Sequence, residues 1–431
     1  MIATINKVVN GVVILSVVFG LLFWAYSSKI FERNLSSGGS ASLIFWGLED
    51  ESVMQPVIDA YTKDNPQVRI TYVQQSIINY RTRLQTQLKE GKGPDIFDIH
   101  NSWFPMFSGY LSVMPSDLMS QNDFLQTFYP VAGDSLTSGG KIYAIPREVD
   151  GLALYYNDDI LKSANVQVPT TWAQFRDAAR QVTVKDQQGQ IVTSGAALGT
   201  TNNVDFWPEI ITLLFYQEPD GDLKNPDNDA GKEVFKFYTS FVTDTQNQTW
   251  NSLEPSSTKM FVDGKLAFYF APAREAPEIR QANPNLVFRT APVPQLPGKE
   301  ISLGTFWAEA VSAYSPSQAQ AWRFLKYLSG KEALQILYRH QVAAEGIGEP
   351  FPRVDMAELQ TKDPILGAFI TQGNYYKSWY LNSDTEDVGI NQDMIQAYQP
   401  AVDNADNGGY STTIDQAVQT VIDKYWPRTV K

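Results

Sequence analysis

Strand-like and helix-like hydrophobic patterns alternate early in the chain, and this alternation restricts the possible folds more than any other feature of the sequence. Three short apolar stretches have the composition of strands, namely Ser42–Gly47, Val68–Val73 and Asp95–Ile99. Between them, apolar residues recur at helical spacing, in 53–61 and again in 80–88. The order strand, helix, strand, helix, strand predicts an α/β fold with a mainly parallel sheet covered by helices.

Length and composition narrow the class of protein further. The chain has 431 residues, of which 43% are hydrophobic, and this is enough for two or more lobes. The net charge is −13 and Lys and Arg do not cluster, so we expect no nucleic-acid partner. Cysteine is absent, which excludes disulfides and cysteine nucleophiles. The only imidazoles are His100 and His340, which argues against a multi-histidine metal centre, and we expect no cofactor.

The N-terminal region is uncharged over the 19 residues Val8–Tyr26, which is close to the length that spans a bilayer as a helix. A stretch rich in Gly and Ser follows. We assign 1–33 to a transmembrane anchor or uncleaved signal and 34–41 to a flexible tether. Two other interpretations stay open, a signal peptide cleaved near Ala25 and Ser27 or a buried core helix. With a retained anchor, the protein would be a single-pass protein of the cell membrane with its soluble domain on the extracytoplasmic side.

Three charged residues lie at the midpoint of the stretch Gly140–Leu161, between two apolar and strand-like segments, 142–145 and 152–156. They are Arg147, Glu148 and Asp150, and apolar residues flank them on both sides. Such charges are explained if the chain leaves one hydrophobic core there and enters another, because a junction between lobes is concave and solvated. We therefore predict a cleft between two lobes at this point, with these side chains facing its occupant.

A series of motifs then follows in a recognisable order. They are the strand ending at Trp46-Gly47, LQTQLKEGKGPDIFDI (84–99), GKIYAIPREVDGLALYYNDDIL (140–161), VPTTWAQF (168–175), MFVDGKLAFYF (260–270), APVPQLPG (291–298) and LGTFWAEAVSAYSPSQAQAWRFLKYL (303–328). In this order they resemble the extracellular solute-binding proteins of ABC importers, specifically the maltose and oligosaccharide receptors. The resemblance covers the chain from about residue 42 to its end.

This resemblance implies a periplasmic-binding-protein-like fold, in which a ligand binds between two lobes that close around it. The first lobe would comprise 42–147 and 291–345. The second lobe would comprise 148–290 and the C-terminal helices in 346–431. The resemblance also implies a carbohydrate ligand, ABC transporter permease subunits as partners, and a monomer.

Sugars present weakly apolar ring faces and a rim of hydroxyl groups, so their sites need flat aromatic side chains and planar hydrogen-bonding groups. Asp150 occupies the position at which the maltose receptors carry a ligand-binding carboxylate, and we predict that it contacts the ligand. The alternatives for Asp150 are a salt bridge with Arg147 or a hydrogen bond at the lobe junction.

Side chains after the first and third strands are further candidates, because open α/β sheets bind ligands at the carboxyl ends of their strands. The candidates are Trp46, Glu49 and Glu51 after the first strand, and Asn101, Ser102 and Trp103 after the third. The two glutamates also suit the N-terminus of a helix, and packing is the alternative for the tryptophan after the third strand. The resembled receptors carry mostly charged contacts after this strand, so maltose specificity is not expected to transfer.

The later part of the chain supplies five more candidates. Phe206 and Trp207 match an aromatic-Trp-Pro segment of the family and are possible sugar platforms, with core packing as the alternative. Arg274 stands where the family often has a cleft aromatic, so it could bind sugar hydroxyls or indicate an anionic ligand. Trp307 follows a glycine that would let the chain approach a ligand closely, and Trp379 is a further aromatic candidate.

These observations predict a membrane-tethered receptor that captures a carbohydrate by lobe closure and delivers it to a permease, with no enzymatic activity. Two other functions stay open. A glycoside-processing enzyme would need two carboxylates across a sugar subsite, for which Asp150 with Glu49 or Glu51 is the available pair. A sensor of the same fold would pass lobe closure to a partner other than a permease.

Overall fold

The computed structural model describes residues 40–245, 248–385, 387–405 and 413–426. The predicted apolar anchor and most of the tether lie outside these described residues. Within the described ranges, no helix is both long enough and apolar enough to cross a membrane.

The first sheet has the strand order β2-β1-β3-β13-β6. β1 pairs in parallel with β2 and β3, whereas β13 is antiparallel to β3 and β6, so four of the five strands share one direction. The sheet is therefore mainly parallel, as the early pattern predicted. Its strands are β1 (Ala41–Gly47), β2 (Val68–Gln74), β3 (Ile96–His100), β6 (Ala144–Pro146) and β13 (Trp307–Val311).

The second sheet has the order β11-β7-β10-β9-β8 and is mixed, with one parallel pairing between β10 and β9. Every residue of the apolar strand β10 is buried, because this strand lies in the middle of the sheet. The strands are β7 (Ala153–Asn157), β8 (Val184–Lys185), β9 (Ile191–Ala196), β10 (Leu266–Ala271) and β11 (Phe288–Ala291). Two small sheets pair β4 (Thr137–Ser138) with β5 (Lys141–Ile142) and β12 (Ser302–Leu303) with β14 (Tyr376–Lys377).

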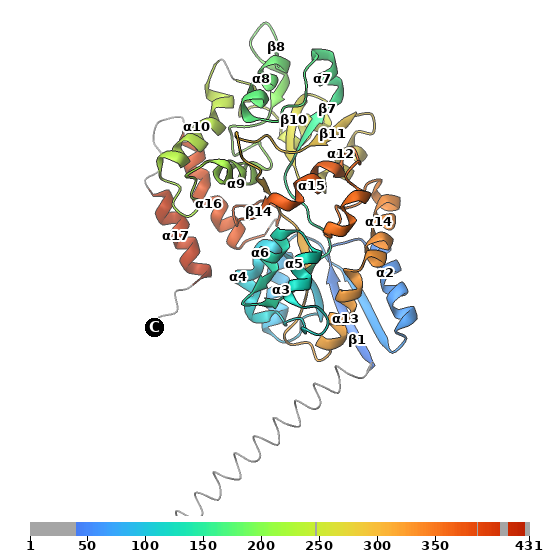
Figure 1. The fold of residues 1–431 in the computed structure, drawn as a ribbon. Coiled ribbons are helices and arrows are strands. Elements are labelled where there is room, and N and C mark those ends of the chain that lie inside the picture. Colours follow the sequence, from blue (N-terminus) through green and yellow to red (C-terminus); the bar gives the residue numbers. More distant parts are fainter. Residues whose placement is uncertain (1–39, 246–247, 386, 406–412, 427–431) are drawn as a thin grey trace, which may run out of the picture.

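Helices cover both sheets, and Figure 1 shows them as two groups, one around each sheet. The helices of the first part of the chain are α2 (Glu51–Asp64), α3 (Tyr80–Lys89), α4 (Phe104–Phe107), α5 (Gln121–Thr127), α6 (Pro130–Leu136), α7 (Asp158–Ala164), α8 (Trp172–Val182), α9 (Trp207–Gln217) and α10 (Asp229–Thr243). Those that follow are α11 (Ser257–Val262), α12 (Glu275–Ala282), α13 (Gln318–Leu328), α14 (Lys331–Glu345), α15 (Leu366–Gln372), α16 (Ile390–Asp403) and α17 (Ile414–Tyr425).

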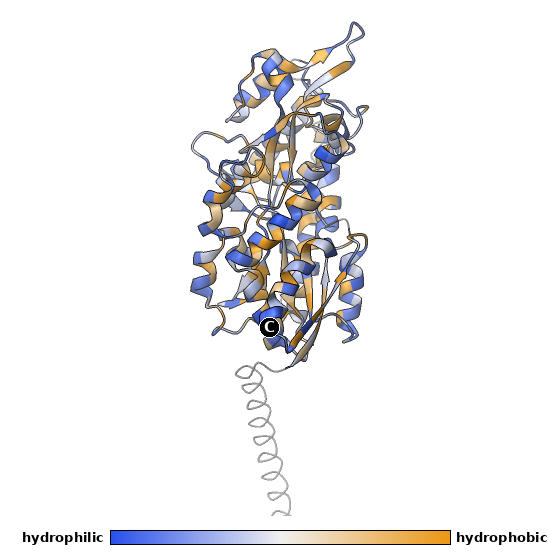
Figure 2. Cartoon of the chain, turned by 90° about the vertical axis from the view of Figure 1, so that its right-hand side faces the viewer, coloured by the Kyte–Doolittle hydropathy of each residue, from blue (hydrophilic) through white to orange (hydrophobic). Residues whose placement is uncertain are grey.

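Each sheet has its own large hydrophobic core. The first core is built around Phe45 and Phe97, and the second around Leu154 and Phe268, all fully buried. Apolar segments run through the interior of both groups, while the outer helix faces are polar (Figure 2). Two cores of this size define two lobes, which agrees with the predicted two-lobed α/β organisation.

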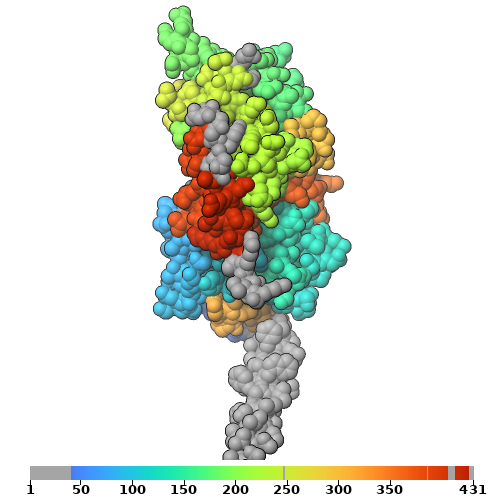
Figure 3. Space-filling view, turned by 90° about the vertical axis from the view of Figure 1, so that its left-hand side faces the viewer, coloured from blue at the N-terminus to red at the C-terminus, as the bar shows by residue number. Residues whose placement is uncertain are grey.

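The chain passes between the cores more than once in its described part. It first leaves the first core after β6. Val293 and Leu303 pack in the second core and Phe306 in the first, so the return lies between Leu303 and Phe306. After α14 the chain enters the second core at Ile347, and Tyr376 packs once more in the first core. The C-terminal helices α16 and α17 pack on the second core, and Figure 3 shows them on one side of the molecule, next to both lobes.

Candidate functional site

The first crossing buries all three charges that interrupt its apolar sequence. Arg147, Glu148 and Asp150 are 6%, 5% and 2% exposed. The backbone is tightly packed here, since a β-carbon on Gly151 would lie 2.2 Å from the carbonyl oxygen of Leu303. Only glycine fits this position, so the crossing segments are held close together at the centre of the molecule.

Arg147 turns back toward the first sheet. Its Nη1 atom lies 3.4 Å from Asp98 Oδ2 on β3 and 3.4 Å from Glu309 Oε1 on β13, and its Nε atom lies 3.4 Å from Glu349 Oε2. Burial raises the pKa of Asp98, and it raises the pKa of Glu309 well above the usual range. Glu148 accepts a hydrogen bond from the Trp307 backbone N–H (3.2 Å). The cluster therefore holds more carboxyl groups than cations.

Asp150 fixes the start of α12 in the second lobe. Its Oδ1 atom accepts hydrogen bonds from the backbone N–H groups of Gly151 (2.6 Å) and Ala273 (2.8 Å), and its Oδ2 atom accepts one from Arg274 (3.2 Å). Burial raises the pKa of Asp150 to about 7. The sequence offered three roles for Asp150, namely a ligand contact, a salt bridge with Arg147 and a hydrogen bond at the lobe junction, and the structure shows the last of these. Arg147 pairs with other carboxylates.

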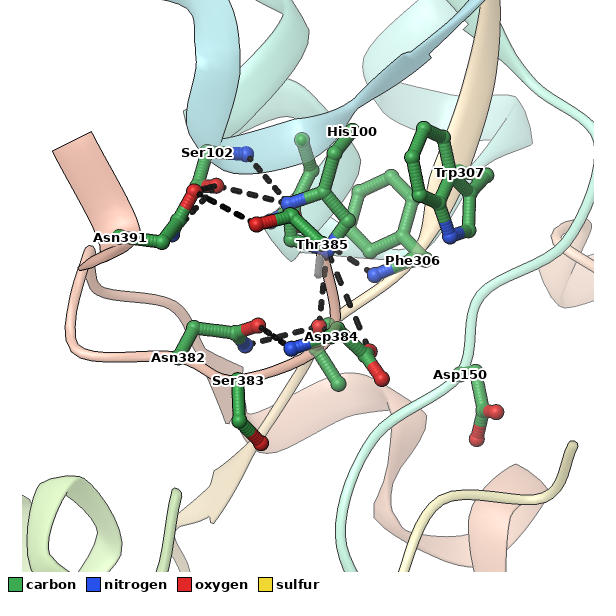
Figure 4. A network of polar contacts seen from close by, with 12 residues as sticks. His100, Ser102, Asp150, Phe306, Trp307, Asn382, Ser383, Asp384, Thr385 and Asn391 are labelled. Carbon is green, nitrogen blue, oxygen red and sulfur yellow. Dashed lines mark hydrogen bonds and ion pairs between the residues drawn. The ribbon is translucent and has the colours of Figure 1, made fainter. Parts of the chain in front are cut away.

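A polar network connects the two lobes at the end of β3 (Figure 4). His100 Nδ1 lies 2.7 Å from Ser102 Oγ, and His100 Nε2 lies 2.9 Å from Thr305 Oγ1. The Thr305 hydroxyl donates to Asp384 Oδ2 (2.7 Å), and Asp384 Oδ1 accepts from Arg274 Nε (2.8 Å) and also from Nη2 of the same guanidinium. Burial lowers the pKa of His100 to about 4, so its ring is neutral at physiological pH.

The Asp384 end of this network belongs to the junction segment, Leu381–Asn391, whose residue 386 lies outside the described residues. The second lobe holds the segment through Glu209, whose carboxylate accepts from the backbone N–H (2.5 Å) and hydroxyl (2.9 Å) of Ser383. The first lobe holds it where Asn391 bonds to Ser102 and to the Trp103 indole N–H (3.2 Å). The junction segment therefore connects the lobes through buried polar contacts.

Two cavities lie beside the junction segment. The aromatic cavity has a volume of about 370 Å³ and combines four aromatic rings with hydroxyl and amide groups. Its lining residues are Asn101, Ser102, Phe104, Asp134, Ser135, Thr137, Ser138, Tyr216, Lys377, Ser378, Trp379 and Tyr380.

The acidic cavity is larger, at about 540 Å³, and both lobes contribute to it. The first lobe supplies the loop after β1, the start of β13 and the end of α14, and the second lobe supplies α12. Its lining residues are Leu48, Glu49, Ile77, Arg147, Arg274, Pro277, Glu278, Gln281, Trp307, Ala344, Glu345, Glu349 and Asp384.

The predicted site residues separate into three groups in this structure. Glu49, Arg274 and Trp307 line the acidic cavity, and Asn101, Ser102 and Trp379 line the aromatic cavity. The others line neither of these two cavities: Trp46 and Trp103 pack in or against the first core, Phe206 and Trp207 pack in the second core, Asp150 lies beneath α12, and Glu51 begins α2.

Several residues of the junction were missed by sequence reasoning, above all Thr305, Asp384, Asn391 and Glu349. They meet partners that lie far away along the chain, such as Ser102 for Asn391 and Arg147 for Glu349. No local motif or spacing marks them. The one available signal was a run of polar residues after Trp379 in a part of the chain expected to be helical. In the described part of the chain, no group of three or more His, Asp or Glu residues is placed to hold a metal ion.

Solved structures of sugar-binding proteins share the fold of this chain. The sugar-binding protein MalE from Xanthomonas citri is 20% identical, with a TM-score of 0.69 and a match that covers 89% of this chain and 96% of that protein. A cyclo/maltodextrin-binding protein is 18% identical, with a TM-score of 0.68 and coverage of 90% and 97%. The structure therefore has a two-lobed α/β fold of the periplasmic-binding-protein type.

The sequence then places the chain within a family. The family model for bacterial extracellular solute-binding proteins matches residues 57–366, and the chain belongs to this family. The multiple sugar-binding protein of Streptococcus mutans is 22% identical over 324 residues, which is 70% of this chain and 74% of that protein. The arabinooligosaccharide-binding protein of Halalkalibacterium halodurans is 27% identical over 167 residues, and the maltotriose-binding protein of Pyrococcus abyssi is 25% identical over 142 residues.

The last two matches span only 36% and 30% of the length of those relatives. The relatives and structural neighbours are solute-binding proteins and not enzymes. This agrees with the prediction that the chain has no catalytic activity and removes the glycoside-processing alternative.

Proposed function

We propose that this chain captures a carbohydrate in the acidic cavity, closes its lobes around it and delivers it to an ABC transporter permease. The observation that carries the proposal is the position of the cavity, which is lined by both lobes at the crossing between their cores. A ligand that contacts both lobes binds the closed form more tightly than the open form, and this difference in affinity stabilises the closed form. The sugar-binding names of the relatives support the same ligand class.

The side chains of the acidic cavity suit a sugar. Trp307 presents an indole that is held by edge-on contacts with Trp103 (5.1 Å between ring centroids) and His100 (5.2 Å). A fixed aromatic ring is suited to the apolar face of a sugar. The carboxylates of Glu49 and Glu349 accept hydrogen bonds, and charge-assisted bonds of this kind suit hydroxyl groups.

An anionic solute fits the cavity less well, although the sequence left this possibility open through Arg274. The Arg274 guanidinium is already paired with Asp384 and, at 3.2 Å, with Glu275. A ligand carboxylate or phosphate would have to displace these partners and approach further glutamates on the same cavity. The charge of the site therefore favours a neutral or cationic ligand.

The extracytoplasmic location follows from the family, and we propose that the N-terminal apolar stretch holds the receptor at the membrane. A tethered receptor stays close to its permease, which raises its effective concentration there. The test is protease treatment of intact cells that express the full-length chain, followed by fractionation. The anchor is supported if protease removes the soluble domain and leaves an N-terminal fragment in the membrane fraction. Release of the intact domain into the medium without protease contradicts it.

Calorimetric titration of the purified full-length protein with a panel of mono-, di- and oligosaccharides tests the carbohydrate proposal. At least one sugar should bind, and a concentration of 100 times its Kd should stabilise the fold by about 2.7 kcal/mol. Trp307→Leu should weaken this binding by about 2 kcal/mol, or roughly 30-fold, because the sugar loses its aromatic platform. Trp379→Ala in the aromatic cavity is the matched control. A protein that binds none of the sugars refutes the proposal.

A further inference from the structure

The charges around the acidic cavity do not balance. Both of its arginines are committed to carboxylates, Arg147 to Asp98 and Glu309 and Arg274 to Asp384 and Glu275. Four more carboxyl groups line the cavity, from Glu49, Glu278, Glu345 and Glu349, and of these Glu349 also lies 3.4 Å from Arg147 Nε. No lysine is among the described residues that line it. The cavity as a whole therefore carries an excess of negative charge on walls from both lobes.

Two of these carboxylates are held together at close range. The Gln341 side-chain amide donates to Glu49 Oε2 (2.8 Å) and to Glu349 Oε2 (2.6 Å). Gln341 is 2% exposed and Glu49 is 8% exposed, so solvent screens the pair poorly. Burial and then the charge of Glu349 raise the pKa of Glu49 to about 7. Two like charges on one amide are a costly arrangement that a bound cation would relieve.

A second and independent feature indicates a ligand with hydrogen-bond acceptors. Arg147 lines the cavity and is 6% exposed, and its Nε–H is buried without a hydrogen bond. Glu349 Oε2 lies 3.4 Å from this nitrogen but does not complete the bond. A buried N–H without a hydrogen bond is costly even beside an opposite charge, so an acceptor from a ligand, such as a hydroxyl oxygen, would supply the missing bond.

We infer that the acidic cavity binds a sugar that carries a protonated amino group, that is, an amino sugar or an oligosaccharide with an amino sugar at one end. The amine lies against Glu49 and Glu349, a hydroxyl group accepts from Arg147 Nε, and Trp307 covers a ring face. Glu278 on α12 contributes its charge from the second lobe. This inference rests on the proposed carbohydrate function and names the class of sugar.

The test compares pairs of sugars that differ in one substituent. The purified full-length protein is titrated calorimetrically at pH 7 with three pairs of sugars: glucosamine and glucose, galactosamine and galactose, mannosamine and mannose. The glucosamine disaccharide of chitosan, its N-acetylated form and cellobiose are titrated in the same way. In at least one pair the amine should bind roughly tenfold more tightly than the hydroxyl analogue, because it gains a charge-assisted contact. N-acetylation should abolish this preference, since it removes the charge.

The variants assign the preference to particular residues. Glu49→Gln combined with Glu349→Gln keeps the size of both side chains and should reduce the preference to less than about threefold. Glu278→Gln, on the exposed side of α12, should reduce it partly. The matched control is Glu90→Gln at the exposed end of α3, which should leave the preference unchanged.

The outcomes separate the inference from the proposed function. Neutral sugars that bind as tightly as their amines in every pair overturn the inference and leave the carbohydrate proposal intact. An amine preference that survives the double glutamine variant also overturns the inference, because the cation then lies elsewhere. Failure of every sugar to bind overturns both. Thermal melting of each variant shows whether it is folded, and removal of one carboxylate of the repelling pair should leave the Tm equal or higher.

Discussion

The aromatic cavity and the acidic cavity both lie beside the junction segment, yet they are built from different chemistry. Four aromatic rings and several hydroxyl groups line the first, whereas seven charged side chains line the second. The network of His100, Thr305 and Asp384 lies between Ser102, which lines the first cavity, and Trp307, which lines the second (Figure 4).

This difference teaches that composition alone does not identify the ligand site of such a fold. The aromatic cavity resembles a sugar site by its residue types. The acidic cavity, however, has the loop after β1 and the crossing of the lobes on one wall and α12 on the other, so closure of the lobes changes it directly. Its position between the lobes therefore favours the acidic cavity as the ligand site.

The largest effect is expected for Arg147→Met, which removes the cation beneath the acidic cavity. Asp98 and Glu309 are 0% exposed and would lose their only nearby positive charge in the described cluster. We expect a loss of about 3–5 kcal/mol in the free energy of unfolding, measured by urea denaturation with tryptophan fluorescence.

The control for Arg147→Met adds Asp98→Asn and Glu309→Gln to the same chain. If unpaired charge is the cause, this triple variant should recover part of the lost free energy, because no buried anion then lacks a partner. A loss below about 1 kcal/mol in the single variant would mean that the carboxyl groups are already neutral in the folded protein.

Much of the fold could be predicted from the sequence. Alternation along β1 buries Leu43 and Phe45 and exposes Ser42 and Ile44, and such short-range patterns locate strands and helices well. The boundaries between the lobes were harder to predict. The predicted return to the first lobe was at residue 291, whereas Val293 and Leu303 still pack in the second core and Phe306 is the next residue in the first.

The candidate site was harder to predict for a physical reason. Trp103 was a candidate for the cleft because it follows a strand, but it is fully buried and stacks on Phe107 at 5.6 Å. Aromatic residues suit both cores and sugar faces, so the sequence cannot distinguish these roles. The contacts of Asp384 and Asn391 depend on how distant segments pack, and hydrophobic periodicity carries no information about polar pairs of this kind.

The second prediction concerns His100, which belongs to the network between the cavities. The folded pKa of about 4 lies below the ordinary value of 6.5, so the unfolded chain binds this proton more readily than the fold does. The stability that depends on the neutral ring is fully present above about pH 6.5 and is lost as the pH falls toward 4. At about pH 5 the loss should be about 2 kcal/mol.

Unfolding of the wild type and of His100→Gln at a series of pH values measures this effect. Gln keeps hydrogen-bonding capacity without titrating, so its stability should fall less steeply in this window. The groups that face the ring, Asp384 and Arg274, have opposite effects on its pKa, and both stay in the variant. Equal slopes for the two proteins would mean that His100 titrates normally in the folded state.

The third prediction concerns Asp384, which belongs to the polar network between the two cavities. Asp384→Asn weakens the contact with the partly exposed Arg274 and the bond from Thr305. Because Asp384 is linked through Thr305 to His100 of the first lobe, the closed form should lose about 1 kcal/mol, seen as a roughly fivefold weaker sugar affinity in calorimetry. Asp117→Asn, an exposed residue on the turn before α5, is the control, and it should not change the affinity. An unchanged affinity in Asp384→Asn would show that the network does not contribute to closure.

The smallest effect is expected for Trp379→Ala, and it decides most sharply between the two cavities. The Trp379 ring packs against Tyr380 (5.0 Å between centroids) in the aromatic cavity, and its buried indole N–H makes no hydrogen bond. If the sugar binds in the acidic cavity, removing this ring should change its Kd by less than about twofold, which is the usual outcome for a residue outside a binding site. A loss as large as that of Trp307→Leu would move the ligand to the aromatic cavity, because a stacking ring contributes only where it touches the sugar.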